Sequence, residues 1–226
     1  MVKYTSLFLD IDNTLLDFTK AEEVAVGTVL KNHGLPHNEA AIAKYSAINQ
    51  TYWERFEKGE IEKNEIYEGR FRTFAEFFNQ KADTAAISED YKNELSVQYF
   101  KIDGAIDILE YLTAKGYRLY ATTNGLASTQ YRRIKNSGIE KYFDDIFVSE
   151  SAGHQKPEKE YFDYVIDNIP EKDRSKMLVV GDSLSSDILG GINSNIDTCW
   201  FNPNHKKTEY KITYEIKKLS ELENLL

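Results

Sequence analysis

Two aspartates, one residue apart, follow directly on a short apolar run near the start of the chain. The apolar run is Leu7-Phe8-Leu9, and the acidic pair lies in the segment Asp10-Ile11-Asp12-Asn13-Thr14. A short, continuous apolar run is consistent with a strand that is buried on both faces, as in a parallel sheet. Ligands of open α/β sheets bind beyond the carboxyl ends of the strands. The segment therefore predicts a parallel sheet with a polar site at its edge.

The two carboxylates also constrain the chemistry of that site. Carboxylates this close together repel each other unless a cation or a shared proton compensates their charge. The pair suggests a metal-assisted reaction in which one carboxylate attacks and the other transfers a proton. A calcium-binding loop would carry Asp or Asn at its fifth position and Gly at its sixth, where this chain has Thr14 and Leu15. Two solvated aspartates after a strand are the alternative that this segment alone leaves open.

The length and charge of the chain narrow the range of partners. Its 226 residues are enough for one large core, or for a core with a smaller second domain. The net charge of -9 argues against a nucleic-acid polymer as partner, because such binding requires clustered Lys and Arg. A small anionic substrate is compatible with this charge, since a metal ion and one lysine can reverse its sign locally.

The single cysteine and the lengths of the apolar segments bear on location. Cys199 cannot form an internal disulfide, and its place near a predicted strand end favours a buried apolar role over a nucleophilic one. No apolar segment reaches the length of a membrane span, and the first residues carry no signal-peptide pattern. We therefore expect no membrane partner and a cytoplasmic location, while nothing in the sequence sets the oligomeric state.

From residue 102 onward, segments typical of helices and strands alternate. Such alternation predicts a parallel sheet with right-handed crossovers. The fold class is thus α/β, with a Rossmann-like parallel sheet core and helices on both of its faces. Helices are predicted over residues 105–115, 128–137, 157–166 and 184–193, and strands over 118–122, 145–148, 177–180 and 198–201.

Residues 17–99 show a different sequence pattern, in which helix signals follow one another without a convincing strand. Thr19 and Glu22 form a predicted capping box for the first helix, and Ser88 is the predicted N-cap of the last. This segment lies between the first strand and all the others. It therefore predicts an inserted all-α helical-bundle cap at 17–99, within an α/β core made of 1–16 and 100–226. The four helices are expected near residues 19–34, 38–58, 62–79 and 88–99.

Three further polar segments follow predicted strands. They are Thr122-Thr123-Asn124-Gly125, Lys156-Pro157 and Gly181-Asp182-Ser183, the last with Asp187 four residues beyond Ser183. A hydroxyl and a turn of backbone N–H groups before a helix can bind an anion. Taken singly, each segment is ordinary turn or helix-cap chemistry. Their joint occurrence at the strand ends of one alternating chain predicts a single polar site.

In this order of segments the sequence resembles the haloacid dehalogenase-like hydrolase superfamily over essentially the whole chain. The four motifs of that superfamily match Asp10-Ile11-Asp12-Asn13-Thr14, Thr123, Lys156, and the segment from Gly181 to Asp187. The helical bundle looks like the cap that this family inserts between its first two motifs. Parts of the bundle also resemble the cap of the pyrimidine 5′-nucleotidase branch, namely Ile48-Asn49-Gln50 with Trp53, Phe56-Glu57-Lys58-Gly59-Glu60-Ile61, and Gly69-Arg70-Phe71.

The resemblance implies that a phosphate monoester is hydrolysed in two steps through an aspartyl-phosphate. A covalent intermediate of this kind divides one difficult displacement into two easier ones. Asp10 is the implied nucleophile, and Asp12 is implied to protonate the leaving oxygen and then to activate water. The implied substrate is a small phosphorylated metabolite.

The same resemblance implies a Mg²⁺ cofactor, a cation whose preference for oxygen ligands is met by such a site. The implied metal-binding residues are Asp10, Asp12 through its backbone carbonyl, Asp182, and Asp187, the last through a ligand water or by orienting Lys156. The implied phosphate-binding groups are Thr123, the N–H of Asn124, and Lys156. Positioning and electrostatics of this kind dominate phosphoryl transfer.

Substrate specificity is expected to come from the helical cap. The candidate specificity residues are Trp53, Phe56, Gly59 and Arg70. Through the cap resemblance they point to pyrimidine nucleoside monophosphates such as dUMP, UMP or dTMP. The alternative is that Trp53 and Phe56 pack the bundle and that Arg70 forms a surface ion pair.

Other functions share some of these motifs. A phosphatase for a sugar phosphate and a phosphomutase would keep all four of them. A 2-haloacid dehalogenase is disfavoured, because that branch lacks an aspartate at the place of Asp12. A phosphoacceptor signalling module would carry its aspartate on a middle strand and would lack the inserted bundle. A non-catalytic binding protein is disfavoured because every polar group that the reaction needs is present.

Overall fold

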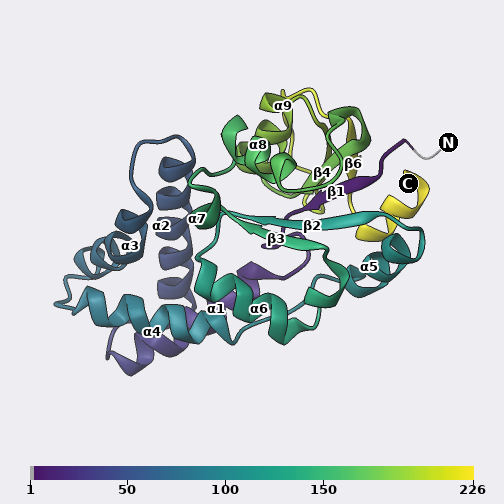
Figure 1. Ribbon diagram of the computed structural model, residues 1–226. Coiled ribbons are helices and arrows are strands. Elements are labelled where there is room, and N and C mark those ends of the chain that lie inside the picture. Colours follow the sequence, from purple (N-terminus) through teal and green to yellow (C-terminus); the bar gives the residue numbers. More distant parts are fainter. Residues whose placement is uncertain (1–2) are drawn as a thin grey trace. The chain divides into compact units, whose positions relative to one another are not determined.

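Six parallel strands form one sheet within the part of the chain that the structure describes, residues 3–226 (Figure 1). In this computed structural model the strand order is β3-β2-β1-β4-β5-β6. Neighbouring strands pair in parallel throughout, which confirms the predicted α/β fold. The strands are β1 (Ser6–Leu9), β2 (Arg118–Thr123), β3 (Asp145–Val148), β4 (Met177–Gly181), β5 (Asp197–Phe201) and β6 (Tyr214–Ile216).

Strand β1 lies inside the sheet, between β2 and β4. Leu7 is in register with Leu119 on one side and with Leu178 on the other, and all four residues of β1 are buried. The chain adds β2 and β3 on one side of β1, and then returns to add β4 and β5 on the other. The carboxyl ends of β1 and β4 thus lie where the strand order reverses. This is the place at which open α/β sheets bind ligands.

Helices cover both faces of the sheet, as the alternating pattern predicts (Figure 1). Successive side chains of a strand point to opposite faces. Leu7 packs in the core cluster that includes residues of α5 (Ala105–Ala114) and α6 (Ala127–Ser137), whereas Phe8 packs with residues of α8 (Lys159–Asp167). Complete burial of a large apolar side chain contributes about 1.5–3 kcal/mol. Two such layers therefore hold the end of β1 firmly in place.

The core also departs from the predicted elements in four places. Strand β6 was not predicted, because it has three residues and only Ile216 among them is buried, so it carries no periodic signal. The predicted helix 184–193 is divided into a π-helical turn, Leu184–Ile188, and α9 (Leu189–Asn193). Pro157 precedes α8 and does not open it. A short helix, α7 (Ser149–Ala152), follows β3.

Residues 18–99 form a second compact unit, while residues 1–17 and 100–226 form the first. Aromatic rings fill the interior of the second unit: Tyr45 stacks on Phe71 with 5.0 Å between ring centroids, and Tyr91 lies 5.7 Å from Tyr45. The helices of this unit are α1 (Phe18–Asn32), α2 (Glu39–Glu57), α3 (Lys63–Phe77) and α4 (Thr84–Ser96).

Two predicted helix starts in this unit are wrong. Helix α1 begins at Phe18, one residue before the predicted N-cap Thr19, and Glu22 accepts a hydrogen bond of 2.6 Å from Asn49 Nδ2 in the interior. Helix α4 begins after Asp83, whose carboxylate accepts from the backbone N–H of Ala86, while Ser88 is buried inside the helix. Asp83 supplies an N-cap one turn earlier than the prediction, which explains the shift.

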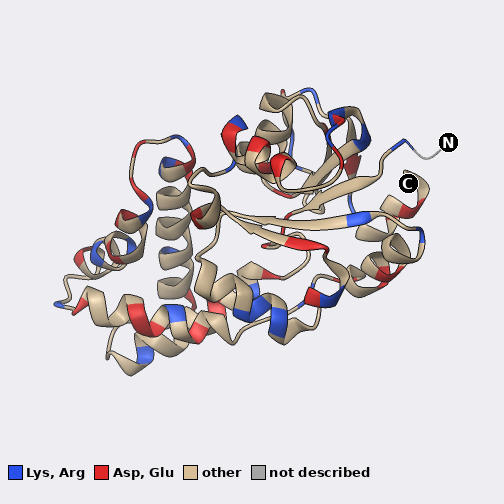
Figure 2. Cartoon of the chain, in the orientation of Figure 1, with Lys and Arg blue, Asp and Glu red and all other residues tan. Residues whose placement is uncertain are grey.

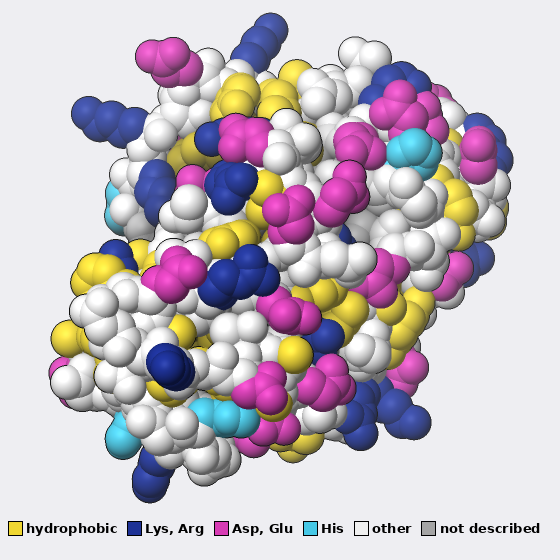
Figure 3. All heavy atoms as spheres, turned by 90° about the vertical axis from the view of Figure 1, so that its left-hand side faces the viewer, with side chains coloured by type: hydrophobic (Ala, Val, Ile, Leu, Met, Phe, Trp, Pro, Cys, Tyr) yellow, Lys and Arg dark blue, Asp and Glu magenta, His cyan; other side chains and the backbone are white. Residues whose placement is uncertain are grey.

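The surface of the described residues is mixed in charge. On the face drawn in Figure 3, acidic and basic side chains lie interspersed. Over residues 3–226, none of the helices combines the length and the apolar character that crossing a membrane requires.

Candidate active site

Three aspartates that are far apart in the sequence come together at the carboxyl ends of β1 and β4. Asp10 directly follows β1, Asp182 directly follows β4, and Asp187 lies in the π-helical turn that comes next. One carboxylate oxygen of each lies within 4.8 Å of the other two. Within the described chain, these three form the group of carboxylates that could hold a metal ion.

Gly181 lets Asp187 fold back against the end of β4. A Cβ atom at residue 181 would lie 2.2 Å from Asp187 Oδ2, which is far closer than any side chain tolerates. Asp187 Oδ1 accepts a hydrogen bond from Lys156 Nζ at 2.6 Å, and Oδ2 accepts one from the backbone N–H of Ser183 at 3.1 Å. With both oxygens engaged, the carboxylate of Asp187 is held in one orientation.

The ammonium group of Lys156 is buried and joins two of these carboxylates. Its Nζ donates to Asp10 Oδ1 at 2.7 Å, to Asp187 Oδ1 at 2.6 Å and to the carbonyl of Thr122 at 2.9 Å. A lysine ammonium has three hydrogens, so these contacts use all of them. The side chain is 2% exposed, which excludes a merely solvated lysine.

Thr123 and Asn124, at the end of β2, lie beside this lysine. Thr123 Oγ1 accepts a hydrogen bond of 3.1 Å from the backbone N–H of Gly125. Asn124 uses its carboxamide to hold the backbone of Lys156, accepting from its N–H at 2.9 Å and donating to its carbonyl at 2.8 Å. The second and third predicted segments are therefore joined by direct hydrogen bonds.

Two residues without a predicted role support the site: Thr14 connects the first and fourth segments, and Trp200 contacts the fourth. Thr14 Oγ1 donates to Asp10 Oδ2 at 3.1 Å and accepts from the backbone N–H of Asp182 at the same distance. Trp200 Nε1, on β5, donates to the carbonyl of Asp182 at 2.9 Å. The place of Thr14 in the acidic segment was a signal that could have found it. Trp200 carries no such signal, because only the pairing of β4 with β5 brings it there.

Asp12 lies apart from the carboxylate cluster. Its side chain is 26% exposed, and its two oxygens accept from Arg133 Nη1 and from Gln130 Nε2, both on α6. These partners stand 121 and 118 positions away in the chain, so no local pattern could have indicated them. The participation of the Asp12 backbone carbonyl in metal binding stays a prediction.

Burial and mutual repulsion raise the pKa values of the clustered carboxyl groups. Burial raises the pKa of Asp10 to about 7; the charge of Asp187 adds to this effect, and that of Lys156 opposes it. Burial likewise raises the pKa of Asp182 well above its usual range, reinforced by Asp10 and Asp187. Burial lowers the pKa of the Lys156 ammonium, but the charges of Asp10 and Asp187 outweigh it and raise that pKa. One lysine therefore compensates the cluster only in part.

The donor set fits a hard divalent cation. Mg²⁺ prefers oxygen ligands in octahedral geometry and commonly binds through one or two carboxylates with several waters. Such a cation would relieve the repulsion among Asp10, Asp182 and Asp187 and would favour their ionised forms.

The candidate specificity residues Trp53, Phe56 and Gly59 lie at the end of α2 and in the turn that follows it. Phe56 is buried in a small apolar cluster against which the half-buried Trp53 packs, with 5.8 Å between the two ring centroids. This burial supports the packing alternative for Phe56. Gly59 is exposed and has a φ of 71°. A specificity role for these residues stays a prediction.

The fourth candidate, Arg70, is buried inside the helical unit. It is 4% exposed, and its Nη1 donates to Asn49 Oδ1 at 2.8 Å. Its guanidinium carbon lies 4.5 Å from the centroid of the Tyr91 ring. The alternative of a surface ion pair is therefore wrong, because the side chain has no access to the surface. A role for Arg70 in specificity stays a prediction.

The fold and this site together define a class of protein: an α/β protein with a parallel sheet, whose acidic and basic groups gather at the carboxyl ends of strands where the strand order reverses. Comparison with known proteins gives the particular family. Residues 7–201 match the haloacid dehalogenase-like hydrolase family, and the chain belongs to that family. The resemblance inferred from the four motifs is thereby confirmed.

Three relatives are similar along almost their whole length. YfnB of Bacillus subtilis, which is named as a HAD-hydrolase, is 40% identical over 228 residues, covering 100% of this chain and 97% of YfnB. Two further relatives are named pyrimidine 5′-nucleotidase. PynA of Streptococcus pneumoniae is 36% identical, covering 97% of this chain and 93% of PynA. YjjG of Escherichia coli is 31% identical, covering 100% of this chain and 99% of YjjG. A crystal structure of YfnB bound to magnesium has a TM-score of 0.94 to this chain, covering 99% of it and 98% of YfnB.

Proposed function

We propose that this chain is a Mg²⁺-dependent phosphomonoesterase that hydrolyses pyrimidine nucleoside 5′-monophosphates through an aspartyl-phosphate. The observation that carries the proposal is the carboxylate of Asp10, which lies at the end of an inner strand, 2.7 Å from Lys156 Nζ and grouped with Asp182. The full-length similarity to PynA and YjjG supports the nucleotide as substrate.

In the first half of the reaction, a carboxylate oxygen of Asp10 attacks phosphorus. The bond from phosphorus to the ester oxygen breaks, and Asp12 donates its proton to that leaving oxygen. In the second half, Asp12 takes a proton from a water molecule whose oxygen attacks phosphorus, and the bond from phosphorus to the Asp10 oxygen breaks. Phosphate leaves, and both aspartates return to their starting forms.

Thr123 and Asn124 would hold the non-bridging phosphate oxygens. In the contacts that Thr123 Oγ1 makes with Gly125 and Gln130 it is the acceptor, so its own hydrogen can be directed at an anion. Lys156 has its hydrogens on Asp10, Asp187 and Thr122, so a contact with phosphate requires one of these bonds to be exchanged. These contacts support a role for Lys156 in balancing the charge around Asp10.

The residues that would hold Mg²⁺ are Asp10, Asp182 and the backbone carbonyl of Asp12. When bound, the ion would neutralise charge on the phosphate and the carboxylates. Asp187 already accepts hydrogen bonds at both of its oxygens. This supports the alternative in which Asp187 orients Lys156 and acts on the metal at most through a water molecule.

Selectivity for a pyrimidine would come from the helical unit, because the core groups named above address only the phosphate. Trp53 is the strongest candidate for stacking on a base, because it is half-buried and so retains exposed ring surface. Stacking of a base on an aromatic side chain contributes about 1–3 kcal/mol in single-stranded nucleic-acid binding. That corresponds to roughly ten- to a hundredfold in selectivity.

The test is a comparison of kcat/KM for dUMP, UMP and dTMP with kcat/KM for a hexose phosphate, all in the presence of Mg²⁺. We expect the highest value for a pyrimidine nucleotide. Asp10→Asn protein, purified in the same way, is the control for contaminating phosphatases. A hexose phosphate that exceeds every pyrimidine nucleotide would overturn the substrate, and no hydrolysis of any phosphate ester would overturn the reaction.

A further inference from the structure

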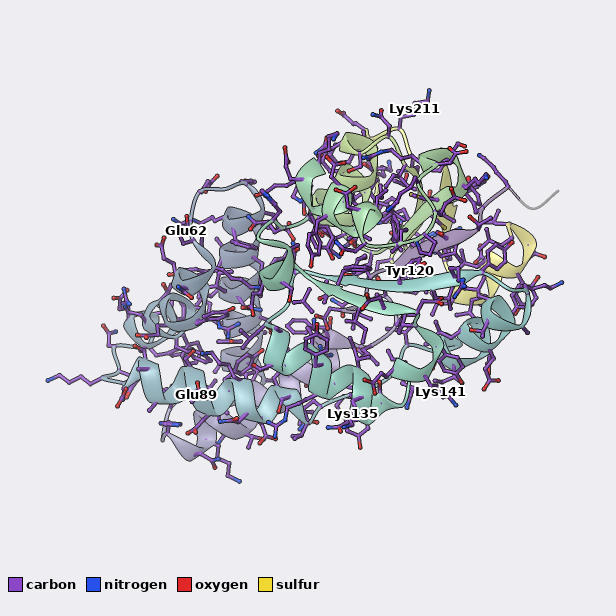
Figure 4. All side chains as sticks on the ribbon, in the orientation of Figure 1. Glu62, Glu89, Tyr120, Lys135, Lys141 and Lys211 are labelled. Carbon is purple, nitrogen blue, oxygen red and sulfur yellow. The ribbon has the colours of Figure 1, made fainter. Side chains whose placement is uncertain are left out.

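Two side chains of one helix hold the carboxylate of Asp12. Arg133 Nη1 donates to Oδ1, and Gln130 Nε2 donates to Oδ2. Residues three apart lie on the same face of a helix, so α6 presents both donors together. Basic residues recur along this helix (Figure 2), and Lys135, in its last turn, lies on its outer side (Figure 4).

The two donors are far more deeply buried than the acceptor. Arg133 is 0% exposed and Gln130 is 1% exposed, whereas the side chain of Asp12 is 26% exposed. A desolvated guanidinium is costly unless it is paired with an acidic group. Arg133 thus places a fixed positive charge next to Oδ1 of Asp12. The partly exposed carboxylate is held by two buried side chains, Arg133 and Gln130.

Gln130 also connects Asp12 to the phosphate-binding segment. Its Nε2 donates to Thr123 Oγ1 at 2.9 Å as well as to Asp12. The Gln130 side chain lies so close to the backbone of residue 125 that a glycine is needed there, because a Cβ atom would lie 2.2 Å from Gln130 Nε2. One carboxamide therefore sets the separation between the carboxylate of Asp12 and the hydroxyl of Thr123.

Asp12 lies in a loop outside the sheet, so its orientation depends on side-chain contacts such as those with Arg133 and Gln130. Strand β1 ends at Leu9, so Asp12 lies three residues beyond the sheet ladder, and Asn13 next to it has a φ of 60°. A proton can be transferred only when the carboxyl oxygen is within hydrogen-bond reach of the leaving oxygen. Each carboxylate oxygen has two acceptor sites, so the contacts with Arg133 and Gln130 leave one on each for substrate or water.

We propose that Arg133 and Gln130 are positioning residues, which orient Asp12 for proton transfer to the leaving group. This inference rests on the role of Asp12 in the proposed function. Positioning residues and phosphate-binding residues differ in one measurable way. The rate effect of a residue that positions Asp12 depends on how much the leaving oxygen needs a proton, whereas the effect of a phosphate-binding residue does not. A nucleoside 5′-oxygen is a poor leaving group that needs one, and p-nitrophenolate leaves without one.

The experiment compares kcat/KM for UMP and for p-nitrophenyl phosphate in wild type and in Gln130→Met, Arg133→Met and Arg133→Lys. The value of kcat/KM reports the steps up to departure of the leaving group. We therefore expect the first two variants to lose at least about tenfold more kcat/KM on UMP than on p-nitrophenyl phosphate. That loss is a small part of what general acid catalysis can contribute. Arg133→Lys retains a charged donor and should lose less than Arg133→Met. Arg132→Met, an exposed arginine on the same helix, is the matched control and should leave both values unchanged.

The outcomes separate the inference from the function on which it rests. Equal losses on both substrates would overturn the inference, because misfolding or poor phosphate placement affects every ester alike. Unchanged values in Gln130→Met and Arg133→Met would also overturn it. Should Arg133→Met fail to fold, Gln130→Met carries the test, since it is nearly isosteric and removes no charge. Asp12→Asn protein that hydrolyses UMP at the wild-type rate would instead refute the proposed role of Asp12 itself.

Discussion

The carboxamide of Asn124 forms two hydrogen bonds with the backbone of Lys156, one to its N–H at 2.9 Å and one to its carbonyl at 2.8 Å. This pairing ties the loop after β2 to the loop before α8. The lysine can therefore reach Asp10 and Asp187 from a backbone that is fixed on both sides of its Cα atom. Asn124 was predicted to contribute its backbone N–H to phosphate, and its side chain has this additional, structural use.

Asn124→Ala should lower kcat/KM through misplacement of Lys156. Two hydrogen bonds to buried backbone groups are lost, and each unsatisfied group costs about 1–3 kcal/mol. We expect a lower melting temperature and roughly a ten- to a hundredfold loss of kcat/KM. The control is Asn168→Ala, at an exposed asparagine whose Nδ2 donates to a helix carbonyl. Wild-type kinetics in Asn124→Ala would show that Lys156 needs no such support.

Asp10→Asn should abolish turnover while the fold is retained. An amide cannot attack phosphorus, and the neutral side chain relieves repulsion with Asp187 and Asp182. Purified protein is assayed for phosphate release, and its folding is checked by circular dichroism. Steady-state hydrolysis by this variant above the level of a buffer blank would refute Asp10 as the nucleophile.

Chelation should remove the activity, and Mg²⁺ should restore it, since the repulsion among the clustered carboxylates calls for a cation. The assay measures phosphate release before chelation, after it, and after Mg²⁺ is added back. Full activity after exhaustive chelation would contradict the proposed cofactor. Ca²⁺ is the informative substitute, and we expect it to bind with little turnover because it favours more ligands at longer distances.

Stabilisation by Mg²⁺ should increase with pH. Burial and the charge of Asp187 raise the pKa of Asp10 to about 7 in the folded protein without metal, against about 3.9 for an unfolded aspartate. A raised pKa contributes stability that is present below about pH 4 and is lost as the pH rises through about 7. Mg²⁺ binds the ionised form, so its effect on the melting temperature should grow from about pH 5 to about pH 8. An effect that shrinks over this range would refute the assignment.

Arg70→Met should destabilise the helical unit more than it changes substrate preference. Arg70 donates to Asn49, which donates to the buried carboxylate of Glu22. Removal of one member leaves a buried charge without compensation, which costs about 3–5 kcal/mol. Denaturant unfolding measures this loss, and the exposed Arg72→Met is the control. A stable variant with an altered ratio of kcat/KM between UMP and a hexose phosphate would support the specificity role instead.

The sequence by itself determined the sheet and the polar segments at its edge. Continuous apolar runs such as Leu7-Phe8-Leu9 indicate strands buried on both faces, and alternation with helices implies parallel pairing. Asp10, Lys156 and Asp182 could be found because each stands directly at the end of such a run or before a helix. The missed strand β6 and the misplaced cap at Ser88 show where local signals were too short or had a competitor one turn away.

Only the tertiary structure decided which side chains touch. Arg133 and Gln130 contact Asp12 across more than a hundred residues, and Trp200 reaches the carbonyl of Asp182 because β5 pairs with β4. For Arg70 the sequence left a surface ion pair open as the alternative to a specificity role, yet the packing of the helical unit buries the side chain. Periodicity reports which face of an element is apolar, whereas a hydrogen bond depends on the distance between two elements. That distance is set by the packing of the whole core.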